Sequence, residues 1–202
     1  MTTEPRIACE PTATVAPAAH LPTQSKAELR RALLAKRGGM ATDVRAAQDA
    51  AIGRNLQAWL NTYPAALLGI YWPIRAEPDL RPVYEVLAAA GITLALPVMN
   101  GADLPLAFAA WAPGAPLVYD RWGIATPATI CPVAPQALLI PCIGFTPQWH
   151  RLGYGGGFYD RTLAQQPRPQ AIGIAYANTC TTFDIGPYDI AMDVVITEGV
   201  PT

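Results

Sequence analysis

The sequence has little charge of either sign and no long apolar run. Lys and Arg number 14 and Asp and Glu number 15, so the formal net charge is -1 at pH 7. Nucleic-acid binding needs a basic surface, because Lys and Arg supply the affinity for the phosphate backbone. A membrane-spanning helix needs about 20 consecutive apolar residues, and no run of that length is present. We therefore expect neither a nucleic acid nor a membrane as a partner.

Cysteine and histidine are also scarce. The cysteines, at positions 9, 131, 142 and 180, form no CxxC pair, and the chain has only 2 histidines. This set does not favour a zinc site, and scattered cysteines are typical of a reducing compartment. The N-terminus has no basic head followed by an apolar run, so it does not resemble a secretory signal. We expect a cytoplasmic protein.

Apolar residues, in contrast, make up 51% of the 202 residues. Residues 1–23 are rich in Pro, Ala and Thr without periodicity, which predicts a flexible N-terminal tail. The remainder, 24–202, is long enough to bury the core of a single domain. Order is expected to begin at Ser25, because Ser25 and Glu28 have the spacing of a helical capping box.

Short helical and extended patterns alternate through this domain. Helices are predicted over 25–38, 42–60, 79–90 and 158–166, and strands over 65–72, 92–97, 104–111, 137–142, 171–176 and 194–197. Residues 112–136 are rich in proline and predict an irregular connection. Alternation of strand and helix indicates an α/β fold, with a mainly parallel sheet between two helical layers in a three-layer α/β/α arrangement.

The glycine-rich segment 151–161, Arg-Leu-Gly-Tyr-Gly-Gly-Gly-Phe-Tyr-Asp-Arg, says most about function. It follows a predicted strand and precedes a predicted helix, at the sheet edge where such folds bind ligands. Its glycines let the backbone approach a ligand, and their N–H groups with the helix N-terminus can bind an anion. Arg151 and Arg161 add charge suited to phosphate, and Asp160 is an oxygen ligand suited to magnesium.

Spacing alone predicts an anion site and goes no further. The segment has neither the Gly-Lys-Ser/Thr of a P-loop nor the GxGxxG of dinucleotide folds. A simpler interpretation is that the glycines only allow a tight turn between a strand and a helix.

The same segment resembles a family signature. RLGYGGGFYDR is very similar to the RLGxGxGYYDR of the 5-formyltetrahydrofolate cyclo-ligases, also called methenyltetrahydrofolate synthetases. Weaker resemblances follow in the family's order between about 25 and 198: KAELR at 26–30, YWP at 71–73, EPD at 77–79, GI at 123–124, LIPCIGF at 139–145 and YDIAMD at 188–193. The resemblance implies a fold related to the sugar-phosphate isomerase and CoA-transferase group.

The resemblance also implies a reaction, in which 5-formyltetrahydrofolate and ATP give 5,10-methenyltetrahydrofolate, ADP and phosphate. The formyl oxygen is phosphorylated, the folate N10 attacks, and phosphate leaves as the ring closes. Such chemistry depends on positioning and charge neutralisation. The implied ligands are ATP as co-substrate, a reduced folate and Mg²⁺, and we expect the protein to be a monomer.

Matching positions carry over the family's site residues one by one. The catalytic positions are Arg151, Tyr154 and Asp160. The ATP-binding positions are Lys26, Arg30, Arg151, Leu152, Gly153, Tyr154, Gly155, Gly156, Gly157, Phe158 and Tyr159. The folate-binding positions are Trp72, Glu77, Tyr154, Gly155, Gly156, Gly157 and Phe158, and the metal positions are Asp160 and Asp189.

Elementary chemistry is compatible with these roles without requiring them. Lys26 and Arg30 share a helix face and could reach one ligand, or they could form a solvated basic surface. A carboxylate such as Glu77 is a natural acceptor for the donor edge of a pterin, and Trp72 could wall the flat ring. From the residues alone, Glu77 could equally be solvated, Trp72 a core residue and Asp189 a turn residue.

Three positions depart from the family pattern. Thr126 replaces an acidic residue, Tyr188 replaces a histidine, and Thr179 falls in the stretch where many relatives have a glutamine. They leave open a divergent paralogue that binds ATP but has lost or changed the folate reaction, for example in thiamine-related metabolism. The sequence is also compatible with a non-catalytic module that binds a nucleotide or folate, and with an isomerase or CoA-transferase on the same fold.

Overall fold

The computed structural model describes residues 24–120 and 123–199, so the predicted tail over 1–23 lies outside the described residues. The helices are α1 (Lys26–Gly38), α2 (Thr42–Thr62), α3 (Arg81–Ala89) and α4 (Phe158–Leu163), with a 3-10 turn η1 (Ala177–Thr179). The main sheet contains β1 (Leu67–Gly69), β2 (Thr93–Met99), β3 (Leu106–Trp111), β6 (Pro132–Val133), β7 (Ala137–Pro141), β10 (Gln170–Ile174) and β11 (Val194–Ile196). Among residues 24–120 and 123–199, no helix has the length and apolar character needed to cross a bilayer.

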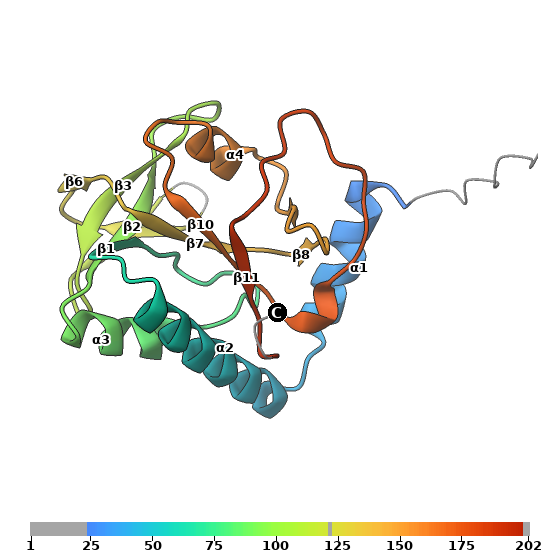
Figure 1. Ribbon diagram of the computed structural model, residues 1–202, viewed down its shortest axis with the longest axis horizontal. Coiled ribbons are helices and arrows are strands. Elements are labelled where there is room, and N and C mark those ends of the chain that lie inside the picture. Colours follow the sequence, from blue (N-terminus) through green and yellow to red (C-terminus); the bar gives the residue numbers. More distant parts are fainter. Residues whose placement is uncertain (1–23, 121–122, 200–202) are drawn as a thin grey trace, which may run out of the picture.

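The main sheet has the strand order β11-β10-β7-β1-β2-β3-β6 (Figure 1). Strands β11, β10, β7, β1 and β2 are parallel, and β3 and β6 join antiparallel at one side. Helix α3 connects β1 to β2, and α4 lies between β7 and β10 in the chain. The predicted α/β class with a mainly parallel sheet is confirmed, whereas the relation to the isomerase and CoA-transferase group stays a prediction.

Apolar side chains on the central strands alternate between two cores. On β7, Leu139 packs with α2 and α3, whereas Leu138 and Ile140 pack with Leu163 of α4 on the other face. Figure 1 shows α2 and α3 on one side of the sheet and α4 on the other. The two helical layers are therefore unequal, since α4 is short and loops complete its side.

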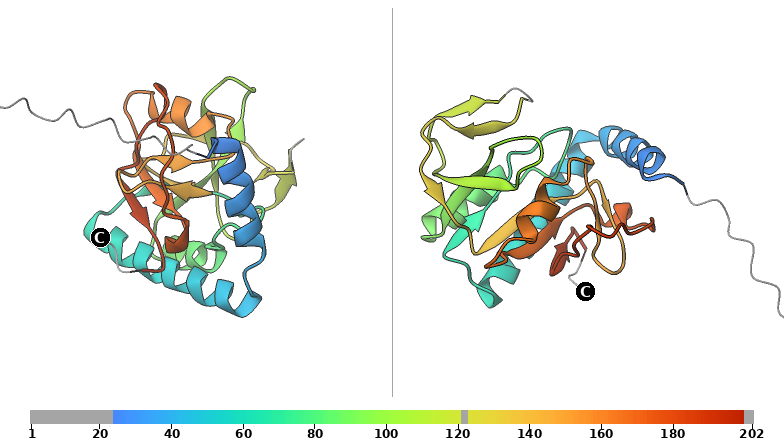
Figure 2. Two further views of the ribbon diagram at one scale, coloured as in Figure 1. Left: turned by 90° about the vertical axis from the view of Figure 1, so that its right-hand side faces the viewer. Right: turned by 90° about the horizontal axis from the view of Figure 1, so that it is seen from above.

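Helix α1 lies apart from these layers, beside β8 (Gly144–Phe145) and β9 (Arg151–Leu152), as both views in Figure 2 show. Its residues Leu29 and Leu33 form a small third core with Ile143, Leu152 and Phe183. The predicted capping box is present at its start: the Ser25 hydroxyl accepts a hydrogen bond from the Glu28 N–H, and the Glu28 carboxylate accepts one from the Ser25 N–H.

Three predicted elements differ from the structure. The strand expected over 65–72 is shorter in the structure, where only Leu67–Gly69 form β1. Ile70 and Tyr71 are buried, but the chain has already left the sheet. The helix expected over 158–166 ends at Leu163, before Pro167, which disfavours helical geometry in the residue ahead of it. The connection 112–136 is more ordered than predicted: it contains the hairpin β4 (Leu117–Tyr119) and β5 (Ala125–Pro127), and it supplies β6.

Candidate active site

Three parts of the chain meet at the carboxyl ends of the parallel strands, which is where open α/β sheets bind ligands. They are the loop after β1, the glycine-rich loop after β9 and the end of α1. Hydrogen bonds between Arg37, Tyr154 and Glu77 join them. This edge of the sheet contains most of the residues that the sequence assigned to a site.

Glu77 is held on the inner side of the loop after β1, with only 3% of its surface exposed. Its Oε2 accepts a hydrogen bond from the Ile74 N–H at 2.9 Å, and its own N–H donates to the Ile74 carbonyl at 2.9 Å. Between them, Arg75 and Ala76 have φ of 48° and 58°, a left-handed conformation that costs free energy in residues other than glycine. The loop therefore stores strain while it fixes the Glu77 carboxylate.

Tyr154 and Arg37 complete the contacts of that carboxylate. The Tyr154 hydroxyl donates to Glu77 Oε1 at 2.8 Å and accepts from Arg37 Nη2 at 2.7 Å. Burial raises the pKa of Glu77 above its usual range, while the hydrogen bonds from Ile74 and Tyr154 and the Arg37 charge oppose that rise. Burial, together with the negative charge of Glu77, also raises the pKa of Tyr154, so the phenol stays protonated at neutral pH.

Helix α1 also contacts the glycine-rich loop one turn nearer its start. Arg30 Nε donates to the Gly153 carbonyl at 2.7 Å, and its guanidinium lies beside Gly155. Gly155 and Gly157 have φ of 96° and 65°, which glycine adopts at little cost. The predicted neighbourhood of Arg30 and the glycine-rich loop is thus present.

The two acidic residues assigned to a metal are each paired with a base. Asp160 forms an ion pair with Arg151 at 2.5 Å, and Asp189 forms one with Lys26 at 2.6 Å. Burial acts to raise the pKa of Asp189, but the hydrogen bonds from Lys26 and the Gly186 N–H, with the nearby positive charges, together lower it below its usual range. Asp160 Oδ1 also accepts from the N–H of Ile190 at 3.1 Å, so Asp160 lies next to the segment that carries Asp189. Within the described ranges, no three His, Cys, Asp or Glu side chains form a metal-binding group.

The arginines at the ends of the glycine-rich segment both donate to backbone carbonyls, and Arg151 also pairs with Asp160, while their role toward an anion stays a prediction. Arg151 Nη1 donates to the Ile190 carbonyl at 2.9 Å, and its side chain is 6% exposed. Arg161 donates to the carbonyls of Ala102, Leu104 and Gly156. These contacts hold the loop in shape, and sequence reasoning could not foresee them because backbone acceptors leave no residue-type signal.

Trp72 packs in a neighbouring pocket rather than among these hydrogen bonds. Its ring packs edge-to-face on Trp111 at 5.7 Å, and the Arg81 guanidinium lies 5.4 Å from its centroid. Trp72, Trp111 and Arg81 line a pocket of about 420 Å³. The structure therefore groups Trp72 with Trp111, a residue that the sequence did not single out.

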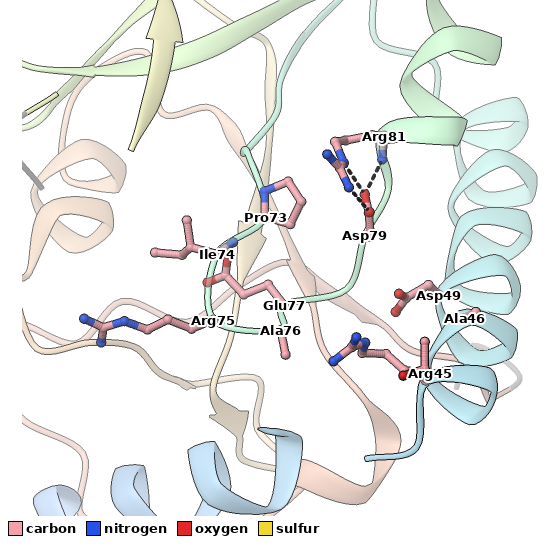
Figure 3. A pocket seen from close by; sticks show the side chains of 11 residues that line it. Arg45, Ala46, Asp49, Pro73, Ile74, Arg75, Ala76, Glu77, Asp79 and Arg81 are labelled. Atoms are coloured by element: carbon pink, nitrogen blue, oxygen red, sulfur yellow. Dashed lines mark hydrogen bonds and ion pairs between the residues drawn. The ribbon is translucent and has the colours of Figure 1, made fainter. Parts of the chain in front are cut away.

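A second pocket, of about 370 Å³, lies between α2 and the loop after β1 (Figure 3). Arg45 and Asp49 line it from α2, and Glu77 and Asp79 from the loop. Figure 3 shows Arg45 directed toward the loop, while Arg75 points away from the pocket. Asp49 is buried and accepts a hydrogen bond from the Tyr176 hydroxyl at 2.7 Å, which ties α2 to the end of β10.

Comparison with known proteins gives the family. The sequence matches the model of the 5-formyltetrahydrofolate cyclo-ligase family over residues 22–198. The chain belongs to this cyclo-ligase family. A relative from Mycoplasma pneumoniae, a 5-formyltetrahydrofolate cyclo-ligase, is 30% identical over 177 residues, covering 86% of this chain and 98% of its own. The cyclo-ligase of Escherichia coli K12 is 29% identical over 163 residues, covering 74% of this chain and 90% of its own.

Solved structures from the same family have the same fold. The 5,10-methenyltetrahydrofolate synthetase of Mycoplasma pneumoniae superposes with a TM-score of 0.72 at 26% identity, covering 87% of this chain and all (100%) of its own. The corresponding Aquifex aeolicus synthetase gives 0.74 at 27% identity, covering 86% and 89%. Both the sequence resemblance and the α/β prediction are thereby confirmed.

The departures from the cyclo-ligase pattern fall in three different places. Thr126 is buried on β5 within the small hairpin, and its hydroxyl lies 3.5 Å from the Val118 carbonyl. Thr179 is buried in η1, where its hydroxyl donates to the Tyr176 carbonyl at 2.7 Å. Tyr188 is 85% exposed, next to Asp189. Each is accommodated without disturbing the contacts among Arg37, Tyr154 and Glu77.

Sequence reasoning missed Arg37, although a signal was present. Lys26 and Arg30 were placed on one helix face, and Arg37 continues that face seven residues after Arg30. It lies in the last turn of α1, where a basic residue interacts favourably with the helix dipole. Its burial, at 2% exposure, could not be read from the sequence.

We predict that Gly155→Ala lowers the free energy of unfolding by about 1–2 kcal/mol, because alanine would be forced into positive φ. Gly153→Ala is the matched control, since Gly153 has no positive φ and nothing lies within 4 Å of its added methyl group. Urea denaturation of the two variants measures the difference. Equal losses in both would show that the loop does not depend on the Gly155 conformation.

Proposed function

We propose that the protein catalyses the ATP-dependent conversion of 5-formyltetrahydrofolate to 5,10-methenyltetrahydrofolate, with release of ADP and phosphate. The observation that carries the proposal is the meeting of α1, the glycine-rich loop and buried Glu77 at one edge of the sheet, in a chain of the cyclo-ligase family. The relatives described above are all named for this activity. The divergent paralogue, the regulatory module and the isomerase or CoA-transferase are not favoured by these matches.

On this proposal, Glu77 receives the donor edge of the pterin. A carboxylate with acceptor oxygens fixed by Ile74 and Tyr154 is a preorganised partner for a flat group that presents N–H donors. Tyr154 is half-open to solvent, with 39% of its surface exposed, so it can also contact the substrate. Trp72 and Trp111 offer an aromatic wall from the neighbouring pocket.

ATP is assigned to α1 and the glycine-rich loop. Lys26 and Arg30 lie on one face of α1, and Arg30 reaches across to Gly153 and Gly155. The other loop positions, from Arg151 to Tyr159, supply backbone that can approach the phosphates closely. The catalytic demand is to hold the terminal phosphate near the formyl oxygen and to neutralise the charge that develops, a role for Arg151, Tyr154 and the α1 cations.

Asp160 and Asp189 fit a magnesium ion that is shared with ATP. They are hard oxygen donors on adjacent segments, and magnesium in nucleotide sites is usually held by one or two carboxylates together with phosphates. When bound, the ion neutralises phosphate charge. Lys26 and Arg151, which pair with these carboxylates, would then become available to the phosphates. We further propose that the protein acts as a cytoplasmic monomer.

The reaction itself is tested with purified protein, ATP, magnesium and 5-formyltetrahydrofolate, followed by the near-ultraviolet absorbance of the methenyl product. We expect product only when ATP and magnesium are both present. Glu77→Gln should raise the KM for the folate more than the KM for ATP, because the amide keeps the shape but removes the charge and one acceptor. A flat trace with wild-type protein that binds ATP would contradict the folate reaction.

Arg30→Met should weaken ATP binding by about 1.5–3 kcal/mol, the range for a hydrogen bond to a charged group. Arg31→Met is the control, because Arg31 is the next residue of α1 but is exposed on another face. Isothermal titration calorimetry with ATP measures both. Equal affinities in the two variants would remove Arg30 from the phosphate site.

Asp189→Asn should raise the magnesium concentration needed for half-maximal turnover by roughly tenfold or more, since even indirect partners of a metal contribute about 10–100-fold to affinity. Asp184→Asn serves as the control, because Asp184 is an exposed acid in the same segment. Turnover is measured across a magnesium titration at saturating ATP. An unchanged profile in Asp189→Asn would rule out its metal role.

A further inference from the structure

Arg37 is a buried cation without a directly paired carboxylate. It is 2% exposed, and none of the ion pairs among the described residues includes it. Its donors go to the Arg75 carbonyl at 3.1 Å, the Tyr154 hydroxyl at 2.7 Å and, more weakly, the Cys142 carbonyl at 3.5 Å. A charge out of water needs compensation, and the carboxylate that can supply it is Glu77, one phenol away.

The groups around Glu77 leave Arg37 as its main electrostatic partner. Arg75 also lowers the pKa of Glu77, but Arg75 is exposed and screened by water. Arg45, Asp49 and Asp79 line the same pocket as Glu77. The uncharged titratable neighbours of Glu77 are Tyr154 from the glycine-rich loop, Tyr159 from α4, Tyr84 from α3, and Tyr71 and Cys142 after β1 and β7. Burial raises the pKa of each of these, that of Cys142 to about 12, so all are neutral at physiological pH.

The geometry makes Tyr154 a relay between the two charges. Its hydroxyl has one proton, and that proton is directed to Glu77 because Arg37 occupies the accepting side of the oxygen. Arg37 also donates to the carbonyl of Arg75, in the strained turn that carries Glu77. One side chain of α1 therefore contacts both supports of the carboxylate: the tyrosine and the turn.

We propose that Arg37 is a positioning residue for folate recognition, which keeps Glu77 anionic and oriented through the Tyr154 hydroxyl and the Arg75 carbonyl. The proposal rests on the proposed function, in which Glu77 accepts hydrogen bonds from the pterin. A protonated Glu77 would turn one acceptor oxygen into a donor and oppose the donor edge of the ring. Arg37 does not contact the substrate in this scheme and acts only through Glu77.

The sign of the pH effect follows from the raised pKa of Glu77. The carboxyl is ionised above its pKa in the folded protein, so folate binding should weaken as the pH falls through that value. Removing the Arg37 charge raises the pKa further, because an opposite charge nearby favours the ionised form. The loss of folate binding should then begin at higher pH.

Three variants separate charge from packing. Arg37→Met keeps most of the volume and removes the charge, and Arg37→Lys keeps the charge but loses the planar donor fork. Lys36→Met is the matched control, because Lys36 is the exposed neighbour on α1 and donates to the Asn178 carbonyl at 2.9 Å. Thermal unfolding of all three variants measures how much each substitution destabilises the fold. Tyr154→Phe, which removes the relay hydroxyl and leaves Arg37 in place, provides a second route if Arg37→Met does not fold.

The decisive measurement uses the ligand-free protein labelled with carbon-13 at the glutamate carboxyl, with Glu77→Gln assigning the signal. In Arg37→Met and Tyr154→Phe the Glu77 signal should titrate at higher pH than in wild type, and in Arg37→Lys it should titrate close to wild type. Lys36→Met should not change it. A Glu77 signal that titrates at the same pH in Arg37→Met, or in Tyr154→Phe where Arg37→Met is unfolded, overturns the proposal.

Measurements of turnover test whether the same substitution changes the use of folate by the enzyme. In Arg37→Met the KM for 5-formyltetrahydrofolate should rise roughly tenfold or more at acidic pH and less at alkaline pH, while the KM for ATP stays unchanged. Equal effects on both substrates, or a pH profile parallel to wild type, would indicate a structural role and overturn the proposal. If wild type does not turn over folate, the proposed function fails, and the carboxyl titration still decides whether Arg37 controls Glu77.

Discussion

Burying the Glu77 carboxylate obliges three separate parts of the chain to meet. The carboxylate needs donors, and the turn that carries it provides one through the Ile74 N–H. The second donor must come from elsewhere, and Tyr154 supplies it from the glycine-rich loop, backed by Arg37 from α1. Helix α1 and the start of the glycine-rich segment share one small core through Leu29, Leu33 and Leu152, and the turn follows a central strand. Loss of any one would leave a buried polar group unsatisfied.

The charged groups of the site neutralise one another. Lys26 pairs with Asp189 and Arg151 pairs with Asp160, so the groups assigned to phosphate and to metal are bound to each other. On the proposed function, the two carboxylates would hold the magnesium ion and the two bases would contact the phosphates. Leaving any of these charges unpaired would be costly in a partly buried site.

Periodicity and spacing predicted much of this molecule from the sequence. Alternation of apolar runs gave the α/β class, the spacing of Ser25 and Glu28 gave the start of α1, and segment 151–161 gave the family. These features depend on local residue order. Clustering of Arg30 with the glycine-rich loop also followed from matching positions.

Contacts with backbone and contacts across the fold could not be predicted in the same way. Arg151 and Arg161 carry charge suited to phosphate, yet their donors bind carbonyl groups, which every residue has. The hairpin of β4 and β5 formed where proline suggested irregular chain, because short antiparallel pairs tolerate proline at their ends. Burial of Arg37 depends on tertiary packing against the loop after β1.

The edges of the main sheet have a consequence for assembly. One edge is β6, two residues long, and its first residue is Pro132, which has no N–H to offer a further strand. The other edge is β11, of only three residues. Short edges and an edge proline protect a sheet against strand addition, the usual first step of aggregation. Folded copies of this chain therefore present little free strand edge, in the main sheet as described, on which to pair.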